Sequence, residues 1–220
     1  MKVALFAATG RAGRTILEEL IRRGHEVTAV ARNLDKLPEQ LPGSVKRVQD
    51  DLSSADRIAE IIAGSDAVVS AFGPSSSDPR YTSDMRYTDQ LVSVTERLIA
   101  AVRKAGAPRL LVVGGAGSLE FSPGVTVLDS GYWPKPYVPI ATSHMKAFAA
   151  LRASDINWTY FSPPMLIQPG ERTGKFRLGG DALIKDAQGN SSVSFEDYAI
   201  ALVDELEKPA HERSRFTIGY

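Results

Sequence analysis

The sequence contains no cysteine and only three histidines. Without cysteine the chain can form no disulfide bond, no thiolate zinc site and no cysteine nucleophile, which agrees with a reducing compartment. His25, His144 and His211 show no metal-ligand spacing, and the segment 115–119 only imitates the GxSxG elbow of serine hydrolases. We therefore predict no metal site, and redox chemistry in this protein would have to come from a bound cofactor.

An excess of charge of one sign is also absent, because 26 lysines and arginines balance 26 aspartates and glutamates. Nucleic acids and anionic membranes require a clustered basic surface, so neither is an expected partner. No window approaches the roughly 18 apolar residues of a membrane span. Gly10 and Arg11 end the first apolar run too early for a secretory signal. We expect a cytoplasmic protein, and the sequence leaves monomer and homodimer open.

The 220 residues, 43% of them hydrophobic, suffice for one domain that buries roughly 70% of its unfolded surface. Short apolar runs alternate with helix-period segments from residue 2 to about residue 162, which predicts strand and helix units around a parallel sheet. The expected strands are 2–6, 26–31, 45–48, 67–71, 109–113, 157–161 and 214–218. The expected helices are 13–23, 54–63, 88–105 and 141–153, with a last one from Ser194 to about Glu207. The sequence thus predicts a doubly wound sheet in three α/β/α layers and a single domain, 1–220.

The first of these helices has a clear amphipathic pattern. Its apolar face consists of Ile16, Leu17, Leu20 and Ile21, and its polar face of Glu18, Glu19, Arg22 and Arg23. After residue 162 the alternation of strands and helices stops, and we expect residues 163–220 to cover the substrate side of the sheet. The irregular segments 73–87 and 117–140 are long enough to suggest a functional role.

The turn between the first strand and the first helix is rich in small residues, with the sequence AATGRAG over residues 7–13. Glycines in this position allow a tight turn and let a pyrophosphate approach the free N–H groups of a helix N-terminus. The turn therefore predicts a Rossmann-type nucleotide site that includes Thr9, Gly10, Arg11, Ala12 and Gly13. Ala7 departs from the three-glycine form, and alanine is tolerated there only at negative φ.

Arg32 at the end of the second strand indicates which nucleotide binds. A carboxylate at this point would bind the ribose 2′-hydroxyl of NAD, whereas an arginine accepts the 2′-phosphate of NADP. No carboxylate follows until Asp35, and Arg11 can supply a second cation. We predict NADP(H) as the preferred cofactor, with NAD(H) possible.

The ends of the third and fourth strands complete the predicted site, since ligands of parallel sheets bind beyond the carboxyl ends of the strands. After the third strand, Asp51 and Leu52 follow Asp50, and a carboxylate there can meet the adenine amino group. Either aspartate can instead cap the helix that follows. After the fourth strand, the small residues around Ala71, Phe72 and Gly73 would admit the ribose next to the nicotinamide.

Taken together, these residues resemble an atypical short-chain dehydrogenase/reductase. The resemblance covers the whole chain and is closest to bacterial NAD(P)H-binding proteins described as NADH-flavin reductases, with a more distant similarity to biliverdin-IXβ reductase/flavin reductase. Its most specific parts are the PGERTG run over residues 169–174 and the VSFEDYA run over 193–199. It implies the strand order 3-2-1-4-5-6-7, and it adds Gly114 and Ser162 to the expected nucleotide site.

The chemistry implied by this family differs from that of its typical members. Typical members use a Tyr-x-x-x-Lys pair on one helix face. Lys146 occupies the lysine position and is a candidate for cofactor binding and catalysis, but Thr142 stands where the tyrosine would be. Tyr137 cannot replace it along one helix, because three prolines lie between residues 134 and 139. Alcohol dehydrogenation is therefore disfavoured.

Hydride transfer to a flavin makes smaller demands, because the ring is a good electron sink that mainly has to be stacked against the nicotinamide. The resemblance to biliverdin reductase places Ser118 and His144 beside the substrate. Ser118 can equally be a turn residue, and His144 can be a solvent-facing helix residue. Aromatic side chains that could cover a flat ring are Phe72, Phe121, Tyr132, Trp133 and Tyr137.

We expect an NAD(P)H-dependent reductase that passes hydride to a flavin or a quinone-like flat acceptor. The alternative is a non-catalytic NADP-binding regulator that senses redox state. Epimerase chemistry is less favoured, because it also needs a pair of groups that handle a proton.

Overall fold

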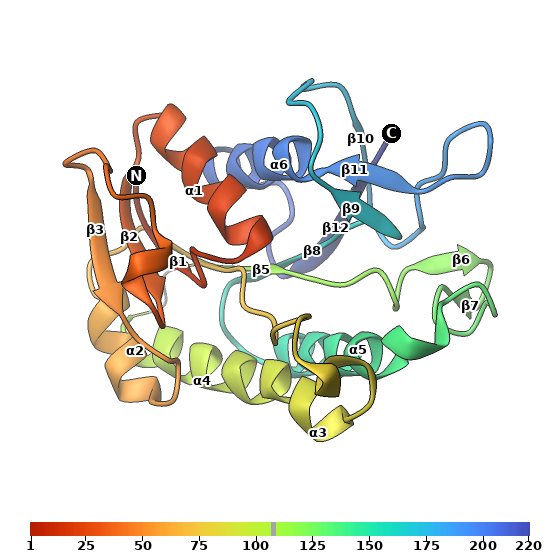
Figure 1. The fold of residues 1–220 in the computed structure, drawn as a ribbon, viewed down its shortest axis with the longest axis horizontal. Coiled ribbons are helices and arrows are strands. Elements are labelled where there is room, and N and C mark those ends of the chain that lie inside the picture. Colours follow the sequence, from red (N-terminus) through yellow and green to blue (C-terminus); the bar gives the residue numbers. More distant parts are fainter. Residues whose placement is uncertain (107–108) are drawn as a thin grey trace.

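The structure of the chain is a computed structural model that describes residues 1–106 and 109–220. A central sheet lies between two layers of helices (Figure 1). Helices α1 (Arg11–Arg22) and α6 (Phe195–Glu207) cover one face. Helices α2 (Ala55–Ile62), α4 (Gln90–Lys104) and α5 (Val138–Ala153) cover the other. The expected three-layer, Rossmann-type single domain is confirmed.

The sheet has eight strands in the order β10-β12-β8-β5-β4-β1-β2-β3. The strands are β1 (Lys2–Phe6), β2 (Glu26–Ala31), β3 (Val45–Gln49), β4 (Ala67–Ser70), β5 (Arg109–Val113), β8 (Trp158–Ser162), β10 (Arg177–Gly179) and β12 (Ser214–Gly219). All neighbours pair in parallel except β10, which runs antiparallel to β12. The predicted order 3-2-1-4-5-6-7 is therefore confirmed, and β10 is an edge strand that the prediction missed.

Shorter elements lie at the carboxyl end of the sheet. They are α3 (Met85–Thr88), three 3₁₀ turns at Leu34–Lys36, Pro79–Thr82 and Lys135–Tyr137, and two small ladders, β6 (Glu120–Ser122) with β7 (Val125–Thr126) and β9 (Leu166–Gln168) with β11 (Ser192–Ser194). They occupy much of the two long segments for which the sequence predicted irregular structure. None of the described helices is long and apolar enough to cross a bilayer.

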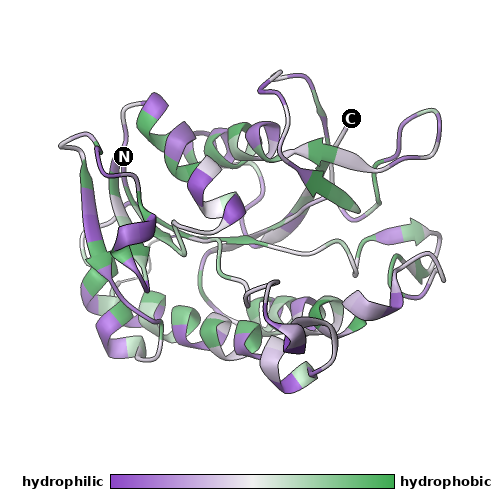
Figure 2. Cartoon of the chain, viewed as in Figure 1, coloured by the Kyte–Doolittle hydropathy of each residue, from purple (hydrophilic) through white to green (hydrophobic). Residues whose placement is uncertain are grey.

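The inner strands of the sheet, such as β1, β4 and β5, are buried on both sides, which explains their continuous apolar runs. Successive side chains of a strand point to opposite faces. Val3 and Leu5 accordingly join the core under α1 and α6, whereas Ala4 and Phe6 join the core under α2, α4 and α5. Figure 2 shows the hydrophobic colour along the strands and on the helix sides that face them.

Two helices start earlier than the sequence suggested. Helix α5 begins at Val138 rather than near 141, because Pro139 lies in its first turn, where the missing N–H is not needed. Helix α1 begins at Arg11 rather than at residue 13. Its polar face was also partly mispredicted: Glu19 is only 3% exposed, whereas Ile21 is just half-buried.

The buried carboxylate of Asp197 organises the chain after residue 162. Its oxygens accept hydrogen bonds from the amides of Thr173 and Gly174, at 2.8 Å each, and from the hydroxyls of Thr173 and Tyr220. The expected cap of α6 is present, since the Ser194 hydroxyl accepts the Asp197 amide at 3.0 Å. The PGERTG run is thus a loop anchored to the start of α6 by its backbone.

Candidate functional site

A cleft of about 550 Å³ opens at the carboxyl ends of β1, β2, β3 and β4. Connections from β1 lead to one side of the sheet and those from β4 to the other, so this is the point where the strand order reverses. Open parallel sheets bind their ligands at such a point. A second cleft of about 470 Å³, lined by Lys2, Gly43 and Gly64 among others, lies at the amino ends of the strands, away from every predicted site residue.

Most of the predicted nucleotide residues line this carboxyl-end cleft. Those that do are Thr9, Gly10, Arg11, Ala12, Arg32, Leu52, Ala71, Phe72 and Gly73. Those that do not are Gly13, Asp51, Gly114, Lys146 and Ser162. Ile167 and Phe195 also line the cleft, so part of the segment 163–220 closes one side of it.

The turn between β1 and α1 is tighter than its sequence suggested. Ala7 has φ +59°, in the left-handed region, so the expectation that alanine would keep a negative φ is wrong. This conformation costs an L-residue roughly 1–2 kcal/mol. Gly13 is required for a different reason: a Cβ at this position would lie 2.2 Å from the carbonyl oxygen of Ala7. Gly13 therefore acts by letting α1 pack against the turn.

The N-terminus of α1 is open towards the cleft. Gly10 is its N-cap residue and provides no side-chain hydrogen bond. The amides of a first helical turn need external acceptors, and the helix dipole favours an anion there. Arg11 is exposed beside this turn, and its Nη2 lies 3.5 Å from the Ser76 hydroxyl of the facing loop.

A group of cations lies at the end of β2. Arg32 and Lys36 both line the cleft, together with Asn33. The Asn33 side chain accepts the Asp35 amide at 2.9 Å and so shapes the 3₁₀ turn that carries Lys36. Sequence reasoning missed Lys36. The signal that the sequence offers is a second basic residue in the short segment that follows Arg32.

The third strand end contributes Asp50 rather than the predicted Asp51. Asp50 lines the cleft, and its Oδ1 accepts the Leu52 amide at 2.7 Å. This bond holds Leu52 at φ +63°, with its carbonyl bound by Arg97 at 3.1 Å. The Asp51 carboxylate points elsewhere and accepts the Ser53 amide at 3.0 Å. Asp50 therefore lines the cleft and Asp51 does not, while the predicted role of Asp51 in cofactor binding stays a prediction.

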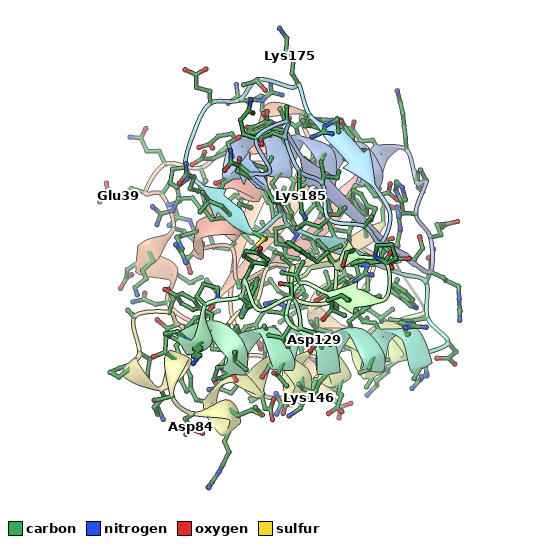
Figure 3. The ribbon with its side chains drawn as sticks, turned by 90° about the vertical axis from the view of Figure 1, so that its right-hand side faces the viewer. Glu39, Asp84, Asp129, Lys146, Lys175 and Lys185 are labelled. Carbon is green, nitrogen blue, oxygen red and sulfur yellow. The ribbon has the colours of Figure 1, made fainter. Side chains whose placement is uncertain are left out.

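Lys146 lies outside the cleft. Its Nζ donates to Asp89 Oδ2 at 2.8 Å, at the junction of α3 and α4, and it also lies 3.6 Å from the sulfur of Met85. Figure 3 shows Lys146 below α5, on the side away from the sheet. The structure thus places Lys146 in an ion pair that joins α5 to its neighbours and outside the cleft that the other predicted residues line.

The glycine pair after β5 makes room for side chains. A Cβ on Gly114 would lie 2.5 Å from the ring of Tyr160, and one on Gly115 would lie 2.7 Å from Cγ of His144. The packing of Tyr160 and His144 therefore explains both glycines, and Gly114 does not line the cleft. His144 is not the solvent-facing residue of the alternative interpretation: it is half-buried, and burial lowers its pKa to about 4.

Ser118 and Ser162 lie on the same side of the sheet end as His144, and neither lines the cleft. Ser118 accepts hydrogen bonds from Arg215 Nη1 at its hydroxyl, at 2.8 Å, and at its carbonyl, at 3.0 Å. The guanidinium of Arg215 is itself almost buried and pairs with Asp181. Ser162 is fully buried, and its hydroxyl has no partner among the described residues. The cleft does not extend to these two residues, and their roles in the site stay predictions. Within the described residues, no cluster of metal ligands occurs.

The doubly wound sheet, the uncapped helix N-terminus at its switch point and the cations beside it define a Rossmann-type NAD(P)-binding protein. In agreement, residues 7–209 match the model of the NAD(P)H-binding family, and the chain belongs to this family.

Individual relatives are similar over nearly their whole length. The uncharacterized protein YwnB of Bacillus subtilis is 39% identical over 99% of this chain and 98% of its own. A proposed epimerase from Bacteroides thetaiotaomicron has a TM-score of 0.89 and 41% identity, covering 100% of this chain and 96% of that one. A proposed NADH-flavin reductase from Streptococcus pneumoniae has a TM-score of 0.83 and 34% identity, covering 100% and 99%. The chain is therefore an oxidoreductase-type NAD(P)H-binding protein.

Proposed function

We propose that this protein is an NADPH-dependent reductase that passes hydride to a flat acceptor, a flavin or a quinone. The observation that carries this proposal is that, among the described residues, the three positions at which the family resemblance predicts proton transfer are not arranged for it. Thr142 replaces the family's tyrosine, Lys146 is paired with Asp89 outside the cleft, and the pKa of His144, at about 4, leaves its ring neutral near pH 7. Among the described residues, none of these groups can protonate an alkoxide, whereas a flavin or quinone can take its proton from water.

The cleft supports NADPH as the cofactor. Its volume of about 550 Å³ and the open N-terminus of α1 suit a dinucleotide with its pyrophosphate on the first helical turn. Arg32 and Lys36 supply two positive charges at the end of β2, where a 2′-phosphate would lie. The acidic residue of the cleft lining, Asp50, follows β3 rather than β2. Bound NADPH would supply a hydride, and one proton from water would complete the reduction of the acceptor.

The resemblance to the proposed flavin reductase of S. pneumoniae adds support for a flavin as acceptor. The similarity to a proposed epimerase weighs less, because epimerisation needs an acid and a base at the reacting carbon, and Lys146 is engaged elsewhere. The absence of cysteine supports the cytoplasm as the proposed compartment.

A steady-state assay tests the proposal. NADPH oxidation is followed by its absorbance, with FMN, riboflavin and a soluble quinone as acceptors. Turnover with at least one of these acceptors is expected. Tight NADPH binding without turnover on any of them would exclude the reductase and favour the NADP-binding regulator, which fits the same cleft and the same incomplete Tyr-Lys pair.

A further inference from the structure

Tyr160 is a fully buried tyrosine that no sequence motif singled out. It lies on β8, and its ring stacks on Phe148 of α5 with centroids 4.5 Å apart. Gly114 provides the space for this ring, since a Cβ there would lie 2.5 Å from it. These contacts leave the ring of Tyr160 little freedom, so its hydroxyl is held at one place between β5 and α5.

Three groups surround this hydroxyl. The amide of Gly115 donates to it at 3.0 Å, the carbonyl oxygen of His144 lies at 3.3 Å, and Nδ1 of His144 lies at 3.4 Å. Burial raises the pKa of Tyr160 well above its usual value, so the hydroxyl keeps its proton. The hydroxyl therefore has one proton to donate and two lone pairs that accept.

Counting these bonds indicates which ring nitrogen of His144 carries a proton. The Gly115 amide can only donate, so it takes one lone pair of the hydroxyl. The His144 carbonyl can only accept, so it takes the proton. The second lone pair of the Tyr160 hydroxyl remains for Nδ1, and Nδ1 can donate a hydrogen bond to it only if Nδ1 carries a hydrogen. All three contacts are satisfied in the Nδ1–H form alone.

We propose that Tyr160 is a positioning residue that holds His144 as the Nδ1–H tautomer, so that Nε2 offers a lone pair to an N–H or O–H group of the bound acceptor. Within the described part of the chain, the side-chain hydrogen bond of His144 is made through Nδ1 and none is made through Nε2, and the residue is only half-buried. Gly115 brings the ring to the carboxyl end of β5, next to β4, whose end lines the nucleotide cleft.

This inference rests on the proposed function and narrows its substrate class. A quinone presents only carbonyl oxygens, which are hydrogen-bond acceptors and cannot use the lone pair of Nε2. The pyrimidine ring of a flavin presents an imide N–H between two carbonyls, which can. His144 in this form selects a flat heterocycle with an N–H edge, and it acts by binding rather than by giving up a proton.

The tautomer can be measured directly. In protein labelled with ¹⁵N-histidine, the spectrum contains only three imidazoles, and His144 is assigned by its loss in a His144→Asn variant. The wild type is expected to show Nδ1 protonated and Nε2 unprotonated near neutral pH. Tyr160→Phe keeps the stacked ring and removes the hydroxyl, so the population should move towards the Nε2–H form. A protonated Nε2 in the wild type, or an unchanged tautomer in Tyr160→Phe, would overturn the proposal.

Tyr198→Phe is the matched control. Tyr198 is also fully buried and donates its hydroxyl to the Phe161 carbonyl at 2.6 Å, on the opposite side of the sheet from His144. Its loss removes a buried hydroxyl without touching His144, and the tautomer should stay as in the wild type. A change in the tautomer population of His144 as large as that in Tyr160→Phe would show that the tautomer responds to the loss of any buried hydroxyl. This result would also overturn the proposal.

Ligand binding gives a second readout. With NADP bound, lumiflavin should bind roughly tenfold more tightly than 3-methyllumiflavin, which lacks the imide N–H, since one hydrogen bond is at stake. In Tyr160→Phe this preference should fall below about threefold. Equal binding of both flavins by the wild type would refute the acceptor role of Nε2. If neither flavin binds while the wild-type tautomer is as expected, the result supports the positioning role of Tyr160 and excludes a flavin as the acceptor.

Discussion

The buried carboxylate of Glu19 offers the sharpest quantitative test of the structure. It accepts hydrogen bonds from Arg172, at 2.8 and 2.9 Å, and from Arg23 at 2.7 Å. Arg172 belongs to the PGERTG loop, so this contact links the loop to α1. We predict that Glu19→Gln, which keeps the shape of the side chain, destabilises the protein substantially.

The magnitude follows from the pKa of Glu19. The hydrogen bond from Arg172, aided by that from Arg23, outweighs the opposing effect of burial and lowers the pKa from 4.5 to about 2. At about 1.4 kcal/mol per pKa unit, this corresponds to about 3 kcal/mol of folding free energy. Arg172 is 41% exposed, so solvent screens part of the interaction. Glu19→Gln is therefore expected to lower the free energy of unfolding by about 2 to 3 kcal/mol.

The assay is urea unfolding followed by the fluorescence of Trp133 and Trp158, near neutral pH and at a series of lower pH values. A carboxylate whose pKa is lowered in the folded state stabilises the folded protein fully at pH values above its pKa in the unfolded state. This stabilisation disappears as the pH falls through its pKa in the folded state. The difference between wild type and Glu19→Gln should thus be complete above pH 4.5, fall by more than half at about pH 3, and vanish below about pH 2.

Glu18→Gln is the control, since Glu18 is the exposed neighbour on the same helix and forms no ion pair in the described structure. It should change the free energy of unfolding by less than about 0.5 kcal/mol. A loss below about 1 kcal/mol for Glu19→Gln near neutral pH, or a difference that stays constant down to about pH 3, would refute the reasoning.

Three further predictions concern the site. Ala7→Gly should stabilise the protein by up to about 1 kcal/mol in thermal or urea unfolding, because glycine adopts φ +59° without steric strain; destabilisation would count against this turn geometry. Arg32→Gln should weaken NADPH binding in titrations roughly tenfold to a hundredfold, while the affinity for NADH changes less than about twofold. The matched control Arg57→Gln, on α2 outside the nucleotide cleft, should change neither affinity. Equal effects on the binding of both nucleotides would exclude the 2′-phosphate contact. Gly115→Ala should cost about 1 to 3 kcal/mol of folding free energy, because its Cβ would lie 2.7 Å from His144, and an unchanged urea midpoint would contradict that packing.

The order and type of the main elements were accessible from the sequence, because they depend on local patterns. Buried strands read as apolar runs, α1 as a repeat of apolar residues with period 3.6, and α6 as a capped start at Ser194. The nucleotide turn could be placed for the same reason, since Gly10 and Gly13 stand directly between a strand and a helix. Even there, backbone strain was not visible, and the positive φ of Ala7 emerged only from the packing of the turn.

The candidate site could be predicted only where its residues follow a strand end. Arg32 and the residues after β4 line the cleft because they leave the carboxyl ends of strands that neighbour β1, at the switch point. Asp50 and Asp51 could not be separated in this way, because the choice depends on which carboxylate accepts the Leu52 amide. Lys36 was missed because a turn, not a strand, presents it.

Contacts between distant parts of the chain determined the rest. Lys146 and Asp89 are 57 residues apart, so no local pattern could show that this lysine is bound outside the cleft. Glu19 has the sequence context of a surface residue, yet it is buried because Arg172, 153 residues further on, covers it. The sequence by itself therefore determined the elements, the layers and the nucleotide turn, whereas the strand order of the sheet was implied by the family resemblance. The roles of individual charged side chains depended on pairing in three dimensions, because a charge is stabilised by the groups that surround it in space rather than by its neighbours in the chain.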